Sequence, residues 1–116
     1  MRGKVSFEGI GEVNATFYAA DGVEAGQVVK LSGDSTAAPC AAGERFCGVA
    51  VSVKTGYAAV QVAGFAEVPC ADGAVAPGWV SLTADGAGGV KKAGDGDAGG
   101  EHLVAAVGGG VAAVML

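Results

Sequence analysis

The chain has 116 residues and a formal net charge of −5, and 51% of its residues are hydrophobic although only 6% are aromatic. This length fits one domain, and the many small side chains each bury little area. Twelve Asp and Glu against seven Lys and Arg argue against a nucleic-acid partner, which needs cations to displace phosphate counterions. The same balance argues against anionic membrane surfaces, and no segment approaches the ~20 apolar residues of a membrane helix.

The cysteines and the N-terminal residues predict a reducing compartment. The three cysteines Cys40, Cys47 and Cys70 are odd in number, and the first thirteen residues lack the apolar run of a signal peptide. We therefore expect free thiols and a cytoplasmic site of synthesis.

Short apolar segments separated by glycine-rich turns follow one another along the chain. Gly accounts for 22 residues, and no window of a dozen residues has helical apolar spacing without a Gly or Pro inside it. This pattern predicts an all-β fold, either a small β-barrel or a β-sandwich. The predicted strands are Ala15–Ala20, Gln27–Ser32, Arg45–Val53, Tyr57–Gly64, Phe65–Pro69, Trp79–Thr83, His102–Val107 and Val111–Leu116.

One of these segments recurs later in the chain. The stretch "AGQVVKLSGD" (Ala25–Asp34) matches "APGWVSLTAD" (Ala76–Asp85) at an offset of 51 residues, with Ala, Val, Leu and Asp at the same places. The repetition predicts two similar halves of about 50 residues, neither of which buries its apolar face alone. We expect these halves to be residues 25–65 and 76–116.

The match between the halves continues beyond the opening stretch if gaps are allowed. After a five-residue insertion, Gly48–Val51 aligns with Val104–Val107, and after a two-residue deletion, Ala58–Val60 aligns with Ala112–Val114. Together the halves form one predicted domain over residues 15–116, preceded by an extended N-terminal arm over residues 1–14.

Candidate metal ligands are few. His102 is the only histidine, and the three cysteines contain no C-x-x-C pair, so the sequence predicts no zinc site. The glycine-rich segment with Asp95, Asp97 and Glu101 has alternating acids like the start of a calcium loop, but it lacks the later acid and the flanking helices of an EF-hand. A solvated surface loop is the preferred interpretation, and calcium binding stays open.

The sequence contains none of the common catalytic motifs. The serines lie in no G-x-S-x-G elbow, and a Ser–His or Cys–His pair would depend on His102, which sits inside an apolar strand. The glycine runs lack the spacing of a nucleotide-binding loop. We expect a protein that is not an enzyme and that binds no cofactor.

Trp79 and the N-terminal arm are the candidate contact residues. Trp79 is the one large anchor among small side chains, and it is either a core plug or an interface hot spot. The arm is either a frayed terminus or a segment that adds to a partner's sheet. Both alternatives stay open for each.

The order of small-residue motifs from Ala20 onward resembles the head-decoration, or capsid cement, proteins of tailed bacteriophages and prophages. The pattern "G-x-x-V-x-L" falls on Gly26–Leu31, and Ala42–Ala50 is similar to "x-A-x-x-G-x-x-F-x-G-V-A", with Gly43–Ala50 matching the end of that pattern. Segments similar to the strand type "G-x-x-A-x-V-x-V-x-G" and to "A-x-x-A-x-G-x-x-V" are Gly56–Gly64 and Ala74–Val80, each with shorter spacing than the family pattern. The acidic segment Asp95–Glu101 and the three cysteines depart from the pattern.

The resemblance implies a structural role without catalysis. Such proteins bind the outside of an assembled head, often as trimers, and bridge neighbouring major capsid subunits. It therefore implies the major capsid protein as partner, a homo-oligomer with a trimer favoured, and a place on the virion surface after synthesis in the bacterial host. The N-terminal segment often contributes to the capsid contact, so the expected contact residues are Arg2, Lys4, Phe7, Ile10 and Trp79.

The strongest rival interpretation is a lipoyl- or biotinyl-carrier-like domain. That fold is also a small β-sandwich of two similar halves, with a modified lysine at a hairpin tip. Lys91 and Lys92 lie near a predicted turn, although the flanking Asp or Met of the carrier motif is missing. A carbohydrate- or peptide-binding β module is a further alternative, but seven aromatic residues supply few groove contacts.

Overall fold

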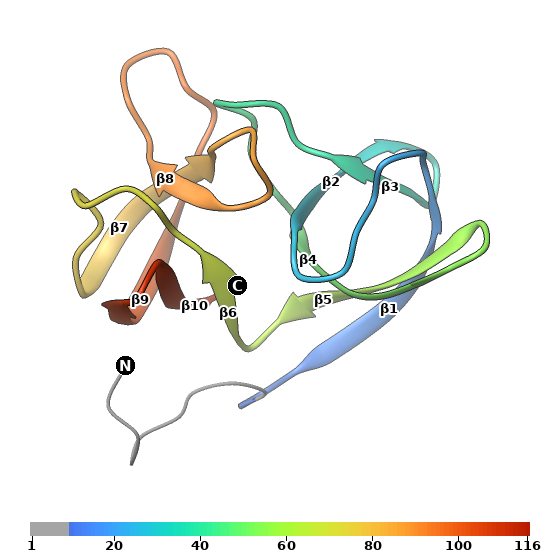
Figure 1. Ribbon diagram of the computed structural model, residues 1–116, viewed down its shortest axis with the longest axis horizontal. Coiled ribbons are helices and arrows are strands. Elements are labelled where there is room, and N and C mark those ends of the chain that lie inside the picture. The colour runs from blue at the N-terminus through green and yellow to red at the C-terminus, as the bar shows by residue number, and fades with distance from the viewer. Residues whose placement is uncertain (1–9) are drawn as a thin grey trace.

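The computed structural model describes residues 10–116, which form ten β-strands and no helix (Figure 1). The predicted all-β fold is confirmed. The first half contains β1 (Val13–Ala19), β2 (Val28–Gly33), β3 (Thr36–Pro39), β4 (Gly48–Lys54) and β5 (Tyr57–Ala63). The second half contains β6 (Phe65–Pro69), β7 (Gly78–Ala84), β8 (Val90–Lys92), β9 (Gly100–Gly108) and β10 (Val111–Met115).

The first five strands close into a barrel in the order β1-β3-β2-β4-β5. Most neighbours are antiparallel, and the barrel is completed by a short parallel pairing in which Tyr18 lies opposite Thr36 and Ala19 opposite Ala37. Val29, Val60 and several alanines are buried inside. Side chains this small suit the narrow interior of a five-stranded barrel.

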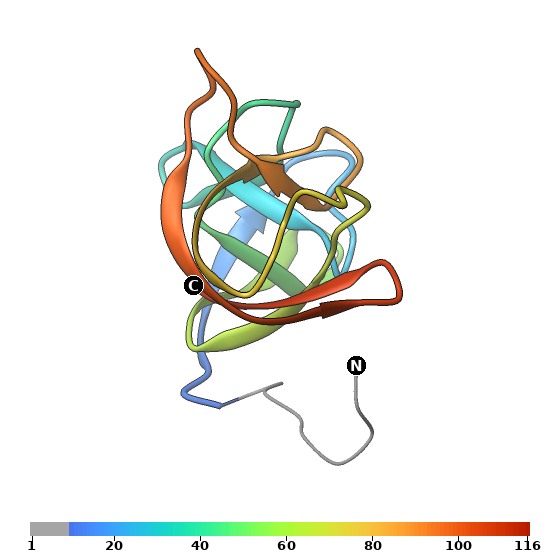
Figure 2. The same cartoon turned by 90° about the vertical axis from the view of Figure 1, so that its left-hand side faces the viewer.

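The second five strands repeat the same order without closing. Their sheet runs β6-β10-β9-β7-β8, which is the barrel order β1-β5-β4-β2-β3 with each strand replaced by its counterpart in the second half. Figure 2 views the molecule from this side, with the β9–β10 hairpin curving across the lower part. The edges β6 and β8 are not paired as β1 and β3 are.

Asp72 occupies the place between these two edges. It follows β6, and its carboxylate accepts hydrogen bonds from the backbone N of Ala74 (2.9 Å) and of Lys92 in β8 (3.1 Å). These two bonds hold the pKa of Asp72 below its usual value. A side chain here replaces the backbone pairing that closes the barrel.

Strand register shows which residues correspond between the halves. Ala50 lies opposite Val60 next to a bulge in β4, and Val104 lies opposite Val114 next to the matching irregularity in β9. The predicted alignment of Gly48–Val51 with Val104–Val107 is therefore wrong by two residues, because Ala50 corresponds to Val104. The alignment of Ala58–Val60 with Ala112–Val114 agrees with the register. A sequence rich in Ala and Val matches itself at several offsets, and only pairing selects one.

The sequence did not predict β3 and β8, and β1 begins earlier than expected. β3 and β8 have four and three residues, with a proline in one and two lysines in the other, so neither has a local strand pattern. Both exist because a neighbouring strand offers pairing partners. β1 begins at Val13, so the last two residues of the predicted arm, 13 and 14, belong to the barrel.

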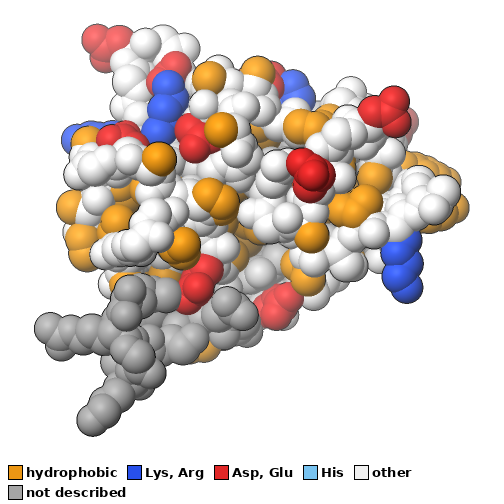
Figure 3. All heavy atoms as spheres, viewed as in Figure 1, with side chains coloured by type: hydrophobic (Ala, Val, Ile, Leu, Met, Phe, Trp, Pro, Cys, Tyr) orange, Lys and Arg blue, Asp and Glu red, His pale blue; other side chains and the backbone are white. Residues whose placement is uncertain are grey.

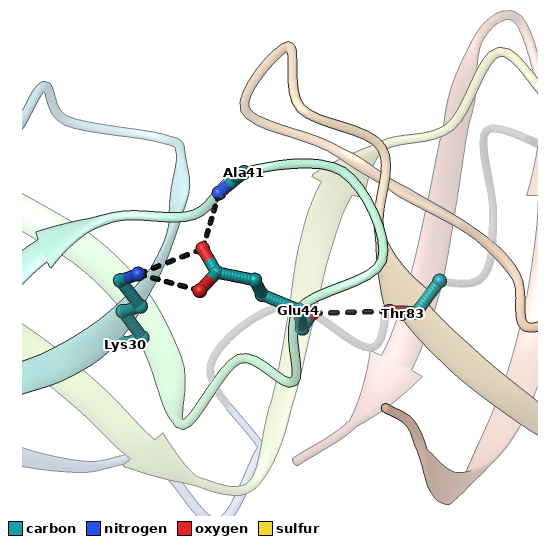
Figure 4. Close-up of polar contacts among 4 residues, drawn as sticks. All are labelled: Lys30, Ala41, Glu44 and Thr83. Atoms are coloured by element: carbon teal, nitrogen blue, oxygen red, sulfur yellow. Dashed lines mark hydrogen bonds and ion pairs between the residues drawn. The ribbon is translucent and has the colours of Figure 1, made fainter. Parts of the chain in front are cut away.

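The connection between β3 and β4 joins the two halves (Figure 4). The N–H of Gly43 donates to the carbonyl of Ala84 at the end of β7 (2.9 Å), and the N–H of Ala84 donates to the carbonyl of Glu44 (3.0 Å). The hydroxyl of Thr83, which is fully buried, lies 3.0 Å from that Glu44 carbonyl and 2.6 Å from the carbonyl of Ala98. This connection therefore extends the second sheet.

The Glu44 side chain fixes the connection to the barrel. Its carboxylate accepts hydrogen bonds from Lys30 Nζ (2.6 and 2.8 Å) and from the backbone N of Ala41 (2.7 Å). These bonds, led by the one from Lys30, keep the pKa of Glu44 below its usual value.

Phe46, at the end of the connection, fills the space between the halves. It is 4% exposed and packs in the core cluster of the second sheet, together with Val28 and Val49 from the barrel. It is the only aromatic side chain among the buried core residues of the described chain. The open sheet thus takes its large filler from the other half.

Replacing Phe46 tests this packing. We expect Phe46→Ala to lower the free energy of unfolding by about 3–5 kcal/mol, because truncation leaves a cavity that small neighbours cannot fill. Phe46→Leu, which keeps most of the apolar volume, is the matched control and should cost clearly less. Urea unfolding followed by circular dichroism measures both, and equal effects of the two variants would contradict the role of the ring.

Acid should weaken the Glu44 contacts. A carboxyl whose folded pKa is depressed stabilises the fold above its unfolded pKa, and this contribution is lost as the pH falls through the folded value. We expect Glu44→Gln to destabilise the protein at pH 7 and to approach the parent as the pH drops below about 4. Urea unfolding over this pH range is the measurement. Glu101→Gln, which alters an exposed carboxylate outside the connection, is the control and should leave the stability at pH 7 close to that of the parent.

Candidate functional site

A row of apolar side chains crosses the outer face of the second sheet. Trp79 in β7 lies opposite Leu103 in β9, and Met115 in β10 lies opposite Phe65 in β6. The neighbours Val104 and Val114 are paired and buried, so Leu103 and Met115 point to the other face and lie side by side. We call Phe65, Met115, Leu103 and Trp79 the apolar row.

Trp79 is the most exposed member of the apolar row. Its side chain is 67% exposed, and Met115 is 38% exposed, whereas Leu103 and Phe65 are half-buried. Of the two interpretations of Trp79, the core plug is therefore wrong. An exposed indole on a rigid strand is the kind of residue that anchors protein interfaces.

Ile10 continues the apolar row beyond β6. Its carbonyl accepts a hydrogen bond from the N–H of Phe65 (2.9 Å), and its side chain is 54% exposed. Gly64 makes this approach possible, because it has φ +87° and a Cβ there would come within 2.5 Å of the Gly11 carbonyl. Of the expected contact residues, Ile10 and Trp79 thus lie at opposite ends of one surface, while Arg2, Lys4 and Phe7 lie outside the described residues.

Three of the four equivalent positions in the first half are buried, whereas Asn14, the counterpart of Phe65, is exposed. Trp79 pairs with Leu103 in the second half, and their counterparts Val28 and Val49 pair in the first half. Gln61, which pairs with Val49, is the counterpart of Met115. Val28, Val49 and Gln61 are 1%, 5% and 6% exposed, since the second half covers them. The amide of Gln61 is satisfied there by the carbonyls of Ala63 and Phe65. The part of the apolar row from Trp79 to Met115 is therefore the counterpart of a packed internal interface, left open in the second half.

Two carboxylates border the apolar row on its own face. Glu67 follows Phe65 by two residues in β6 and lies opposite Ala113, while Glu101 precedes Leu103 by two residues and lies opposite Ser81. Acidic side chains are also prominent on the surface seen in Figure 3. The row thus has an apolar centre with acidic flanks, which suits a partner surface that is apolar and basic.

A second exposed aromatic site lies on the barrel. Tyr18 and Tyr57 face each other across β1 and β5, with ring centroids 5.5 Å apart and side chains 56% and 53% exposed. In Figure 1 this end of the β4–β5 hairpin lies on the side of the molecule away from β7 and β9. The two halves therefore each present aromatic side chains, on different surfaces.

The groove between the halves is lined by several titratable side chains. It has a volume of about 600 Å³, and Lys30, Glu44, Cys47 and His102 are among its lining residues. Lys30 and Glu44 are paired with each other. The His102 ring stacks on Phe46 with centroids 5.0 Å apart, and its Nδ1 lies 2.8 Å from the Met115 carbonyl. These contacts make His102 part of the packing between β9, β10 and the connection.

The cysteines are arranged as separate free thiols. Val29 of β2 pairs with Pro39 on one side and Gly48 on the other, so β2 runs between the segments that carry Cys40 and Cys47. Burial, followed by the charges of Glu44 and Cys47, raises the pKa of Cys40 to about 11, and burial also raises the pKa of Cys47. A raised pKa leaves little thiolate at neutral pH.

The possible calcium loop and the carrier lysines have structural roles. Asp97 accepts a hydrogen bond from the Gly94 N–H (2.9 Å) and lies 3.9 Å from Lys91 Nζ. Within residues 10–116 no three His, Cys, Asp or Glu side chains are grouped to hold a metal ion. Lys91 and Lys92 lie in β8, paired with Thr83 and Leu82, rather than at a hairpin tip.

Of the members of the apolar row, only Trp79 was expected from the sequence to make contacts. Leu103, Met115 and Phe65 were each placed in a predicted strand, but their common face depends on which strands are neighbours and on register. Alternation alone could have suggested that Leu103 and Met115 point away from the buried valines beside them.

Two comparisons of the sequence with known proteins were made. A scan against protein-family models gave no match, and a search of curated proteins gave no match either. In the part of the chain that the structure describes, no helix is long and apolar enough to span a membrane.

The raised pKa of Cys40 has a measurable consequence. At pH 8 a thiol with a pKa of about 11 is roughly 0.1% ionised, against about a quarter for an unfolded cysteine, so alkylation in the folded protein should be ~200-fold slower than in urea. Iodoacetamide labelling followed by peptide mass spectrometry measures the rate at Cys40. Equal rates in buffer and urea at pH 8 would contradict the burial of this thiol.

Proposed function

We propose that this protein decorates an assembled phage head, where it binds the outer surface and stabilises contacts between major capsid subunits. The observation that carries the proposal is the apolar row, which corresponds to a buried interface in the first half yet exposes Trp79 in the second. The sequence resemblance to capsid cement proteins supports the same role. The proposal involves neither catalysis nor a cofactor.

The size of the apolar row suits repeated weak contacts. A stable isolated interface buries about 800 Å² per partner, which is more than four or five side chains provide. On an icosahedral shell, however, an oligomer attaches at several equivalent points, and each attachment raises the effective concentration for the next. A compact body with one modest apolar surface is therefore sufficient for firm binding in this setting.

A bridging protein also needs a surface for its own neighbours. The adjacent Tyr18 and Tyr57 rings on the barrel supply exposed aromatic area away from the apolar row. We assign this site to contacts between copies and the apolar row to the capsid protein. A homo-oligomer, with a trimer favoured, follows from the resemblance, as does a location on the virion surface after synthesis in the host cytoplasm.

The carrier-domain alternative has no observation in its favour. A carrier lysine must be presented at an exposed hairpin tip to reach its ligase, whereas Lys91 and Lys92 belong to a paired strand. The decoration role is therefore the single function that we propose.

Removing the indole should weaken attachment to the head. If Trp79 is an interface anchor, Trp79→Ser should reduce affinity for expanded heads of the encoding phage by at least ~30-fold, the effect of losing a hot spot worth about 2 kcal/mol. Co-sedimentation over a concentration series is the measurement, with circular dichroism as the check on folding.

The matched control changes the other aromatic site. Tyr18→Ser should lower the oligomeric state measured by analytical ultracentrifugation. Its affinity for the capsid per protomer should change less than that of Trp79→Ser. Failure of the parent protein to co-sediment at micromolar concentration would overturn the proposed function. Unchanged binding of the Trp79 variant would remove the apolar row from the contact.

A further inference from the structure

We propose that the partner of the apolar row adds an extended, basic and apolar segment to the edge of β7, where its backbone pairs with that of Trp79. The inference rests on the proposed function only for the identity of this partner as the capsid protein. The open edge itself is a feature of the second sheet. Strand addition of this kind gives affinity through backbone hydrogen bonds and specificity through alternate side chains.

The backbone of Trp79 points to a side of β7 that β8 does not reach. β8 pairs with β7 over Leu82–Ala84, and beyond it the N–H of Ala93 donates to the carbonyl of Ser81 (2.9 Å). Backbone groups alternate in direction along a strand, so those of Trp79, two residues before Ser81, point to the same side. Among residues 10–116 no hydrogen bond to these two groups of Trp79 is found.

The first half shows what occupies the equivalent backbone position. Val28 is the counterpart of Trp79, and its N–H donates to the carbonyl of Gly88, in the connection between β7 and β8 (3.0 Å). The contact is close, since a Cβ at Gly88 would come within 2.7 Å of the Gln27 side chain. A segment from outside the barrel thus supplies a carbonyl to this position in the first half. In the second half the same donor is left for a partner.

The open part of the edge accepts only a short segment. β7 begins at Gly78, and Pro77 before it has no N–H to donate. Pairing is therefore limited to the N–H and carbonyl of Trp79 and to the residues beside it. A short edge next to a proline also opposes unlimited growth of the sheet, which favours one specific segment.

Charge gives the chemistry of that segment. Glu101 lies opposite Ser81 on the face of the apolar row, and exposed Asp95 follows Ala93 by two residues. Neither carboxylate forms an ion pair with any other part of residues 10–116. A segment that places an apolar side chain beside the indole of Trp79 and a Lys or Arg next to it complements this surface.

A second copy of the chain is a less suitable partner. Pairing of two β7 edges would bring together two chains that each carry a net charge of −5. It would also bring no basic group to the acidic side chains beside the edge, because the strand added would be the same Gly78–Val80. The edge is therefore assigned to a different, basic chain.

Amide hydrogen exchange tests the open edge in the free protein. We expect the N–H of Trp79 to exchange at least about 100-fold faster than that of Val28, after correction for intrinsic rates, because only the Val28 N–H is hydrogen-bonded. NMR of the ¹⁵N-labelled protein measures both. Equal protection of the two amides would overturn the proposal.

Two substitutions at position 79 separate the backbone from the ring. Trp79→Ser and Trp79→Pro both remove the indole, but only the second removes the N–H. We expect Trp79→Pro to bind expanded heads at least ~5-fold more weakly than Trp79→Ser, the effect of one lost hydrogen bond. Both should keep the urea midpoint of the parent, since an edge tolerates proline where its N–H faces outward. Val28→Pro is the control and should destabilise the fold. Equal head affinity of the two Trp79 variants would overturn strand addition.

A peptide tests the edge without the capsid. A capped peptide of alternating lysine and valine, at millimolar concentration, should slow exchange of the Trp79 amide, whereas the matched glutamate and valine peptide should not. No slowing by the lysine peptide would overturn the proposal, whatever the heads do. Slowing by this peptide in a protein that fails to bind heads would support the edge site and overturn the proposed function. Protection that grows with protein concentration alone, with a larger mass in analytical ultracentrifugation, would overturn the proposal in favour of a second copy.

Discussion

The hydrogen bonds between the β3–β4 connection and the end of β7 hold the two halves of the molecule in place. Gly43 and Glu44 pair with Ala84 through the backbone, and the buried Thr83 hydroxyl lies beside the same Glu44 carbonyl. Because the connection ends in Phe46, this pairing also sets the one buried aromatic ring between the halves. Without it the open sheet would lose both an added segment and its largest filler, and the face that covers Val28 and Val49 would have no fixed position.

This joint makes two copies of one strand arrangement unequal. The first copy closes on itself and is covered on one outer face by the second, whereas the second stays open, with Asp72 in place of a strand pairing. The same register position is therefore Val28 in a packed interface and Trp79 on the surface. An open copy provides a free face without any additional element, and that is where the chain carries its largest side chain.

The local sequence pattern predicted most of the strands and the two similar halves. Alternating apolar residues and glycine turns identified eight strands, and the echo of Ala25–Asp34 in Ala76–Asp85 indicated the two halves. β3 and β8 could not be predicted, because Thr36–Pro39 and Val90–Lys92 become strands only through their neighbours. The surface was predicted only at Trp79 and Ile10, since Leu103 and Met115 join it through pairing register, which an Ala- and Val-rich sequence leaves ambiguous.

The side chains that stabilise the fold and the exposed apolar row lie in different parts of the molecule. The groups that hold the fold, such as Glu44, Thr83 and Phe46, lie between the halves, and the exposed row lies on the far face of the second sheet. A substitution at Trp79 removes no core packing, so it should change stability little. In the first half the same position is constrained, because Val28 must fit beneath the second half. The repeat thus supplies one buried packing position and one exposed position from a single place in the strand arrangement.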